Sequence, residues 1–138
     1  MKRELPQPVT SPLAGEPGLY QLQARLDVPV GPFTLTAPAG FITDGASIPR
    51  WAWWLIGHPM TGTFQAAAFI HDWLYTSRPV SRVVCDALFC QILREYGVRP
   101  WRAKTMYVAV RIGGWRVWAR QRRRRVNRAG WRPAKGQE

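Results

Sequence analysis

The sequence has no long apolar run and only two cysteines. No apolar stretch reaches the roughly eighteen residues that a membrane-spanning helix needs, and the opening MKRELPQPVTSPLAGEPG lacks the apolar centre of a secretory signal. Cys85 and Cys90 lie five positions apart in a helical pattern, without the further cysteines of a zinc knuckle. We therefore expect a protein made in the cytosol, with two reduced thiols.

The last forty residues lack acidic side chains almost entirely. Residues 1–98 carry seven lysines and arginines against seven acids, so this part of the chain is neutral. Residues 99–138 carry thirteen lysines and arginines against one acid, Glu138. The whole formal net charge of +12 therefore comes from the C-terminal part, which predicts a neutral body with a cationic arm.

The N-terminal third has the patterns of extended chain. A length of 138 residues suits one domain with one modest core. Four prolines in residues 1–18 exclude a helix there and predict an extended lead-in. Apolar and polar residues alternate over residues 19–30 and again in PFTLTAP, which predicts a small antiparallel β-hairpin. The alternating apolar set of its first half is Tyr20, Leu22, Ala24, Leu26 and Val28.

The remainder of the chain has helical periodicity. FQAAAFIHDWLY, residues 64–75, is apolar almost all round and predicts a central helix surrounded by protein. A second helix should follow Pro79, capped by Ser81 and stopped by Gly97. A third should start at Pro100 and carry one apolar stripe, interrupted by a glycine pair that indicates a bend or a close contact with another backbone. The stripe is Trp101, Val108, Ile112, Trp115 and Ala119, and the glycines are Gly113 and Gly114.

These patterns predict an α+β fold, a short antiparallel hairpin packed beside about three helices. The single globular domain should cover residues 19–118, and a basic helical extension should follow over residues 119–138. Of Trp51, Trp53 and Trp54, at least one should be exposed, because three large rings at this spacing cannot all face one site.

Three acids of the neutral body fall among apolar residues. Asp44 lies in FITDGASIPRWAWWLIG, Asp72 lies beside His71 in the central helix, and Asp86 lies in the next helix. An ionised carboxylate is costly to bury without a partner, so these acids should find hydrogen-bond donors. For Asp72 the candidate donors are the TDGAS turn, Arg50 and His71.

The segments TDGASIPR, AAAFIHDWLY and SRVVCDALFCQIL, in that order, resemble a family of small bacteriophage and prophage proteins of unknown function. The resemblance covers roughly residues 20–118 and consists of the motifs TDxASxP, HDxxY and AD. It implies a phage origin and a shared polar cluster, without an established activity, and the long arginine-rich end departs from the family pattern. The matching positions are Thr43, Asp44, Ala46, Ser47, Pro49, Arg50, His71, Asp72, Tyr75 and Asp86.

Three interpretations of the polar cluster compete. In the first, which we favour, it is structural and ties the TDGAS turn to two helices; its members are Asp44, Ser47, Arg50, His71, Asp72, Tyr75 and Asp86. In the second, Ser47 is the nucleophile of a small hydrolase, His71 its base, and Asp44, Asp72 or Asp86 the orienting acid, although GASIP lacks the second glycine of a nucleophile elbow. In the third, His71 and two aspartates bind a metal ion that activates water. Adjacent His71 and Asp72 diverge by about 100° around a helix, which makes them poor joint ligands.

The basic arm, which we define as residues 115–138, combines tryptophans with arginines. Its arginines repel one another and favour an anionic partner; they are Arg116, Arg120, Arg122, Arg123, Arg124, Arg125, Arg128 and Arg132. Nucleic acid is the first candidate, because arginine binds phosphate bidentately and each neutralised phosphate releases counterions. An anionic membrane surface and an acidic protein, such as another phage protein, are further candidates.

The sequence thus predicts a phage-encoded, non-catalytic binding or assembly protein. We expect it in the host cytoplasm when made, with association with the virion as a further expectation, and we expect no cofactor and no metal. The alternative is a small phage hydrolase that acts on cell-wall material through the cluster around His71 and Asp72.

Overall fold

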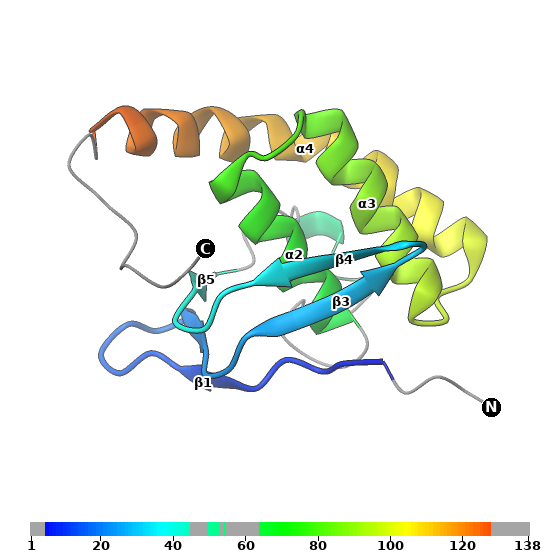
Figure 1. Ribbon diagram of the computed structural model, residues 1–138. Coiled ribbons are helices and arrows are strands. Elements are labelled where there is room, and N and C mark those ends of the chain that lie inside the picture. Colours follow the sequence, from blue (N-terminus) through cyan, green and yellow to red (C-terminus); the bar gives the residue numbers. More distant parts are fainter. Residues whose placement is uncertain (1–4, 45–49, 53, 55–63, 128–138) are drawn as a thin grey trace.

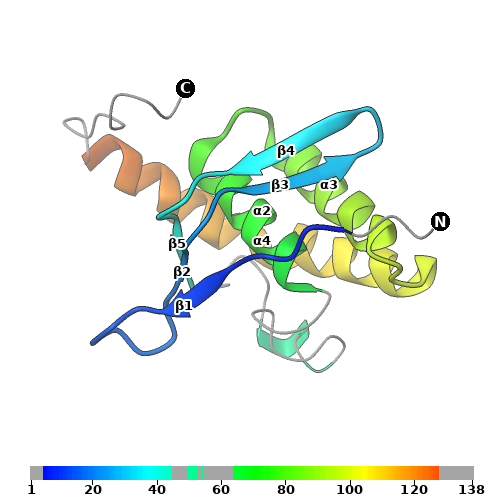
Figure 2. The same cartoon turned by 60° about the horizontal axis from the view of Figure 1, so that its bottom comes forward.

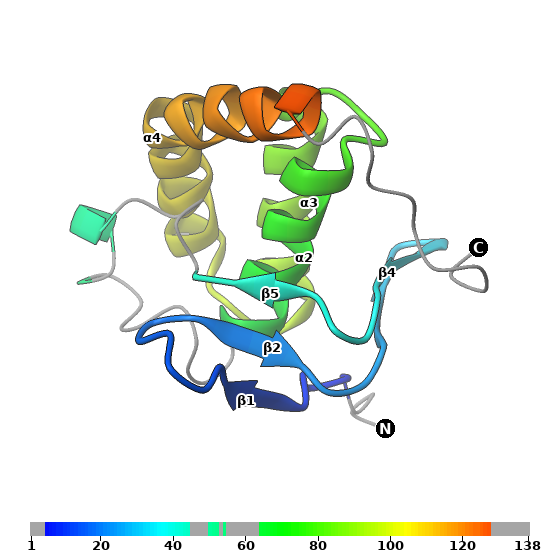
Figure 3. The same ribbon diagram turned by 90° about the vertical axis from the view of Figure 1, so that its left-hand side faces the viewer.

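The fold is α+β, with helices on one side and strands on the other (Figures 1 and 3). The computed structural model describes residues 5–44, 50–52, 54 and 64–127; of Arg50 and residues 121–127 it describes the backbone alone. Within that part of the chain the α-helices are α2 (Phe64–Ser77), α3 (Arg82–Glu95) and α4 (Pro100–Asn127), and a short 3-10 turn, η1, covers Arg50–Ala52. The predicted helices and the hairpin are therefore confirmed.

The strands form two small antiparallel sheets (Figure 2). The predicted hairpin consists of β3 (Leu26–Val30) and β4 (Phe33–Ala37), in which Val30 pairs with Phe33 across a two-residue turn. Gly31 takes a φ of 55° in that turn, a conformation in which a side chain would be strained. The other sheet, which the alternation pattern did not predict, has the order β1-β2-β5 and consists of β1 (Thr10–Pro12), β2 (Tyr20–Leu22) and β5 (Ile42–Thr43).

The predicted first strand is broken where the chain passes between the two sheets. Residues 23–25 bend, so β2 pairs with β1 and β5 while β3 pairs with β4. The alternation is confirmed on both sides of the bend, because Leu22, Leu26 and Val28 are buried. Ala24, which the alternation places inward, is exposed, since the bend takes it out of strand geometry.

Helix α2 lies in the middle of the molecule (Figure 2), where it contacts α3, α4, β3 and β4. Its burial on almost every side explains why its sequence is apolar almost all round. Helix α3 ends at Glu95, and the predicted stop signal, Gly97, has a φ of 85° with its N–H and that of Val98 bound to carbonyls of the last turn. Ser81 occupies the N-cap position of α3, but its side-chain oxygen accepts no capping hydrogen bond within the described structure.

The apolar stripe predicted for α4 faces outward. Large side chains of that stripe, such as Ile112, are exposed, and the face packed against the body carries Ala103, Met106 and Val110 instead. The buried face also contains Gly114, where an added Cβ would lie 2.5 Å from the hydroxyl oxygen of Tyr75. Both faces repeat with helical spacing, and the face with the smaller residues packs inward because it allows α4 to approach α2 closely. The predicted contact of the glycine pair with another backbone is replaced by a close contact of Gly114 with the side chain of Tyr75.

Exposed tryptophans were correctly predicted near the start of the helical region. Trp51 and Trp54 are exposed, while Trp53 lies outside the described residues. Within the described chain, no helix combines the length and the hydropathy needed to cross a membrane. Both cysteines are free thiols, with Cys85 buried and Cys90 half-buried.

Candidate functional site

The candidate site forms where α2 faces α3. His71 and Tyr75 lie four residues apart on α2, so they project from the same face of that helix. Asp86 lies in the first half of α3 and points back at them. All three side chains are fully buried, and the ring of Phe89 packs against that of His71 with centroids 4.7 Å apart.

One carboxylate oxygen of Asp86 is shared by the two residues of α2. The Tyr75 hydroxyl donates to Oδ1 of Asp86 at 2.6 Å, and Nε2 of His71 lies 2.7 Å from the same oxygen. The rings of His71 and Tyr75 are themselves in contact, with centroids 4.3 Å apart. The phenol and the imidazole therefore form a fixed pair of donors for one acceptor.

The other oxygen of Asp86 receives two guanidinium groups. Nη1 of Arg111, on α4, lies 2.9 Å from Oδ2, and Nη1 of Arg82, one turn before Asp86 on α3, lies 3.4 Å from it. Arg82 also donates to the carbonyl oxygens of Val110 and Arg111 at 3.3 and 3.1 Å. The five residues Asp86, His71, Tyr75, Arg82 and Arg111, which we call the Asp86 network, thus join α2, α3 and α4.

The electrostatics of the network are those of an ionised carboxylate with a neutral histidine. Burial acts to raise the pKa of Asp86, but hydrogen bonds from His71, Tyr75 and Arg111 together hold that pKa below its ordinary value. Burial lowers the pKa of His71, which disfavours the imidazolium, so the neutral ring donates from Nε2 to Asp86. Burial and the neighbouring Asp86 raise the pKa of Tyr75, which keeps the phenol protonated as a donor.

Asp72 belongs to a separate contact. Its Oδ2 accepts a hydrogen bond from the hydroxyl of Thr43, at the end of β5, and both side chains are buried. This contact ties the three-stranded sheet to α2. His71 and Asp72, adjacent in sequence, therefore have different partners, as expected from their divergence around the helix.

The predicted cluster is thus only partly brought together in the described residues. His71, Tyr75 and Asp86 meet, while Asp72 pairs with Thr43 instead. Asp44 follows β5 directly and is exposed. Ser47 and the side chain of Arg50 lie outside the described residues, so their places in the cluster remain predictions.

Sequence reasoning missed Arg82 and Arg111, whereas the TDGAS turn, which contains Thr43, was a predicted donor for Asp72, and that contact is confirmed. Arg82 had a usable signal, because it precedes Asp86 by four residues in a predicted helix, the spacing of a helical ion pair. Arg111 had none, because its contact depends on how α4 crosses α3.

The network has the parts of a catalytic pair without access for a substrate. An aspartate that accepts a hydrogen bond from a histidine is the orienting half of a hydrolase triad. Here, however, every atom that could react is enclosed, since His71, Tyr75 and Asp86 have no exposed surface. Among the described residues, no three His, Cys, Asp or Glu side chains are grouped so as to hold a metal ion. The arrangement of these described residues is suited to stabilising the buried negative charge of Asp86.

Comparison with known proteins places most of the chain in one family. The family model described as a protein of unknown function, DUF1353, matches residues 21–110. The uncharacterised protein y4jT of Sinorhizobium fredii is 38% identical over 77 residues, which are 56% of this chain and 23% of that relative. The chain therefore spans about a quarter of the length of this relative. No solved structure matches the chain.

The contact of Gly114 with Tyr75 can be tested by a double-mutant cycle. Gly114→Ala should lower the free energy of unfolding by about 1–3 kcal/mol, because the new methyl group collides with the Tyr75 hydroxyl that holds Asp86. In a Tyr75→Phe background the same change should cost at least about 1 kcal/mol less, since the colliding oxygen is gone. Urea unfolding of the four proteins measures this coupling, and additive effects would contradict the contact.

The buried neutral histidine predicts a loss of stability in acid. His71 has a folded pKa below its ordinary 6.5, so only the unfolded chain takes up this proton just below that pH, and stability should fall as the pH drops below about 6.5. The lowered pKa of Asp86 adds a second loss below its ordinary 3.8. His71→Gln should flatten the first loss, which can reach about 1.4 kcal/mol per pH unit.

The control for this pH dependence is His58→Gln, which removes the other histidine of the chain. Its unfolding free energy, measured by urea titration between pH 7 and 5, should follow the slope of the unmodified protein. A slope that disappears with His58→Gln and persists with His71→Gln would show that the buried histidine is not its source.

Proposed function

We propose that this chain, which belongs to the DUF1353 family of proteins of unknown function, is a non-catalytic binding protein with a structural Asp86 network and a basic arm for nucleic acid. The matched residues 21–110 make up most of the body and include His71, Tyr75 and Asp86. The resemblance noted in the sequence suggests in addition that the protein is phage-encoded, made in the host cytoplasm and associated with the virion.

The structural role of the network is supported by its enclosure and by its full set of partners. Both oxygens of Asp86 are hydrogen-bonded, and the bonds come from three different helices. Removing one partner of a buried charge is far more destabilising than removing an exposed ion pair, so such a network fixes the helices relative to one another. A hydrolase would need a substrate to reach His71, which is entirely covered.

The binding role of the arm is supported by the way α4 continues beyond the body. The helix carries nine lysines and arginines without an acidic residue, and four of its arginines, Arg122 to Arg125, follow one another near its end. Arg116 and Arg120, whose side chains are described, are exposed. The observation that carries the proposal is that one helix is both packed into the body and extended into the arginine run.

Where the arm leaves the body, α4 is held by its residue Trp118. The Arg78 guanidinium lies 4.0 Å from the centroid of the Trp118 ring and donates to the Trp118 carbonyl oxygen. The ring of Tyr75 meets that of Trp118 edge-on, with centroids 5.2 Å apart. These contacts fix the direction of the arm, which reduces the ordering cost of binding.

Nucleic acid suits this arm better than other anionic partners because of its dense phosphates. Arginine donates two parallel hydrogen bonds to one phosphate, and a row of phosphates releases counterions as it is neutralised. An acidic protein surface offers fewer and less regular charges, and it is the other outcome that the following experiment can return.

Deleting residues 119–138 should abolish binding to a double-stranded DNA oligonucleotide at low salt. The milder variant in which Arg122 to Arg125 are all glutamine should reduce the slope of log affinity against log salt by up to about 4, because the slope falls by about 0.9 for each phosphate that is no longer neutralised. Fluorescence anisotropy at several salt concentrations measures both effects.

The control variant combines Arg25→Gln and Arg94→Gln, which remove two exposed cations of the body, and it should bind DNA like the unmodified protein. Polyglutamate serves as a competitor that represents an acidic protein. DNA binding unaffected by the deletion, or stronger binding of polyglutamate than of DNA, would overturn the nucleic-acid proposal.

A further inference from the structure

The outer face of α4 carries a line of large apolar side chains that the fold does not cover. Trp101, Val108, Ile112 and Trp115, which we call the outer stripe, are 61%, 45%, 63% and 54% exposed. Steps of seven, four and three residues place them on one side of the helix, along a line of about 21 Å. Helix α4 is therefore apolar on two opposite faces, and only the inner one is used by the core.

Cations border the outer stripe on both sides. At about 100° per residue, Lys104 lies about 60° to one side of Trp101 around the helix, and Arg116 lies about 60° to the other. Both side chains are exposed, and the guanidinium of Arg116 lies 5.4 Å from the centroid of the Trp115 ring. With no acidic residue anywhere in α4, the borders of the stripe are purely positive.

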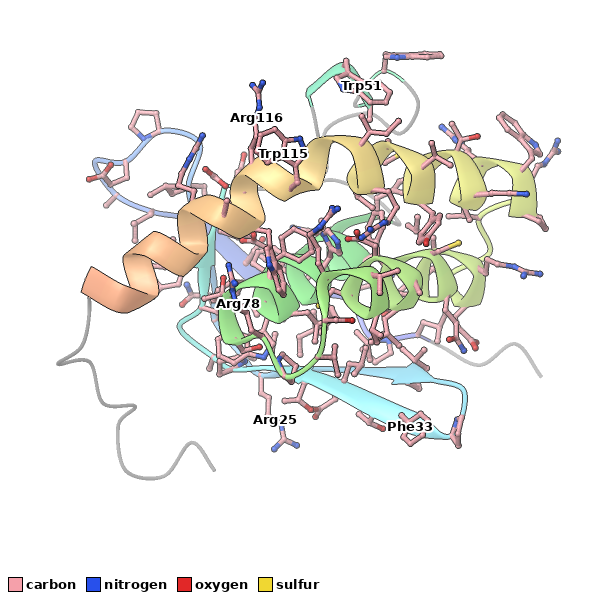
Figure 4. All side chains as sticks on the ribbon, turned by 90° about the horizontal axis from the view of Figure 1, so that it is seen from above. Arg25, Phe33, Trp51, Arg78, Trp115 and Arg116 are labelled. Carbon is pink, nitrogen blue, oxygen red and sulfur yellow. The ribbon has the colours of Figure 1, made fainter. Side chains whose placement is uncertain are left out.

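Another exposed tryptophan, Trp51, lies on the same side of the molecule. In Figure 4 the side chains of Trp51 and Trp115 both lie on the side of α4 that is turned away from α3. Figure 3 agrees, since η1 projects on that side of α4. Trp51 is 53% exposed, so it adds apolar surface on the side of the molecule where α4 already presents two exposed indoles.

We propose that the outer stripe docks onto the surface of an anionic lipid bilayer, with α4 lying parallel to it. Indole rings favour the boundary between headgroups and acyl chains, and bordering lysines and arginines are attracted to anionic headgroups. The stripe is a convex ridge, a shape that enters a deformable lipid surface without needing a matching groove. This docking goes beyond the proposed function, because Trp101, Val108 and Ile112 precede the basic arm.

A second copy of the chain fits this face poorly. Pairing two outer stripes would place two α4 helices against each other, each with nine cations and no acid, in chains whose formal net charge is +12. Like charges at that distance repel, and α4 offers no opposite charge to offset them. A groove on an acidic protein would complement the charge but would also have to match this face closely in shape, which a deformable lipid surface need not do.

The test is co-sedimentation of the full-length protein with vesicles. Vesicles of phosphatidylcholine with about 30% phosphatidylglycerol should bind the protein, and vesicles of phosphatidylcholine alone should bind it at least about tenfold more weakly. The double variant Trp101→Ser/Ile112→Ser, which lies outside the basic arm, should lose about tenfold or more in partitioning to the anionic vesicles, because two large side chains no longer insert.

Phe33→Ser is the matched control. Phe33 is 69% exposed and lies at the edge of the molecule opposite Trp115 (Figure 4), so its replacement should leave vesicle binding unchanged. All three substituted side chains are exposed, and unchanged thermal unfolding would show that each variant keeps the fold. The double variant should bind DNA as before, which separates this proposal from that of the arm.

Three results would overturn the docking proposal. The first is equal binding of the double variant and the unmodified protein to anionic vesicles, which would assign any attraction to the charge of the arm alone. The second is equal loss of binding in Phe33→Ser. The third is a dimer in light scattering that becomes monomeric in the double variant, which would make a second copy the occupant of the stripe.

Discussion

The ionised carboxylate of Asp86 is the constraint on which the arrangement of the helices depends. A buried negative charge is tolerated only with donors on every side, and here these come from His71 and Tyr75 on α2, Arg82 on α3 itself, and Arg111 on α4. The donors on α2 and α4 each fix a distance between two helices. The close approach of α4 to Tyr75 in turn requires a glycine at position 114. Gly114 therefore supports the Asp86 network although it makes no hydrogen bond to it through a side chain.

Much of the fold could be predicted because its signals are local. The helix over residues 64–77, the stop at Gly97 and the turn at Gly31 follow from periodicity and from backbone conformations that glycine favours. The three-stranded sheet could not be predicted, since strands of two or three residues, separated by seven and nineteen residues, carry too little pattern to reveal their pairing. The packed face of α4 was missed for a different reason: hydrophobicity ranked the large tryptophans first, whereas close packing against the body selected Ala103 and Gly114.

The candidate site was likewise only partly predictable from the sequence. The burial of His71, Asp72 and Asp86 was predictable, because each lies in an apolar stretch of helix. Their partners were predictable only in part: the TDGAS turn, which contains Thr43, was expected to bind Asp72, whereas the contact of Arg111 with Asp86 depends on how two helices pack. A polar residue within an apolar helix thus indicates that a contact must exist, and only the three-dimensional arrangement says with what.

The continuity of α4 has a mechanical consequence. The helix runs from Pro100 to Asn127 without interruption and is clasped by Arg78 at Trp118. A force applied to the far end of α4 is therefore transmitted along the helix into the body, because a continuous helix has no flexible joint that would absorb the movement. Arg111 lies seven residues before Trp118 on the same helix and binds Asp86. A force on the exposed end of α4 would therefore act on the buried carboxylate of Asp86.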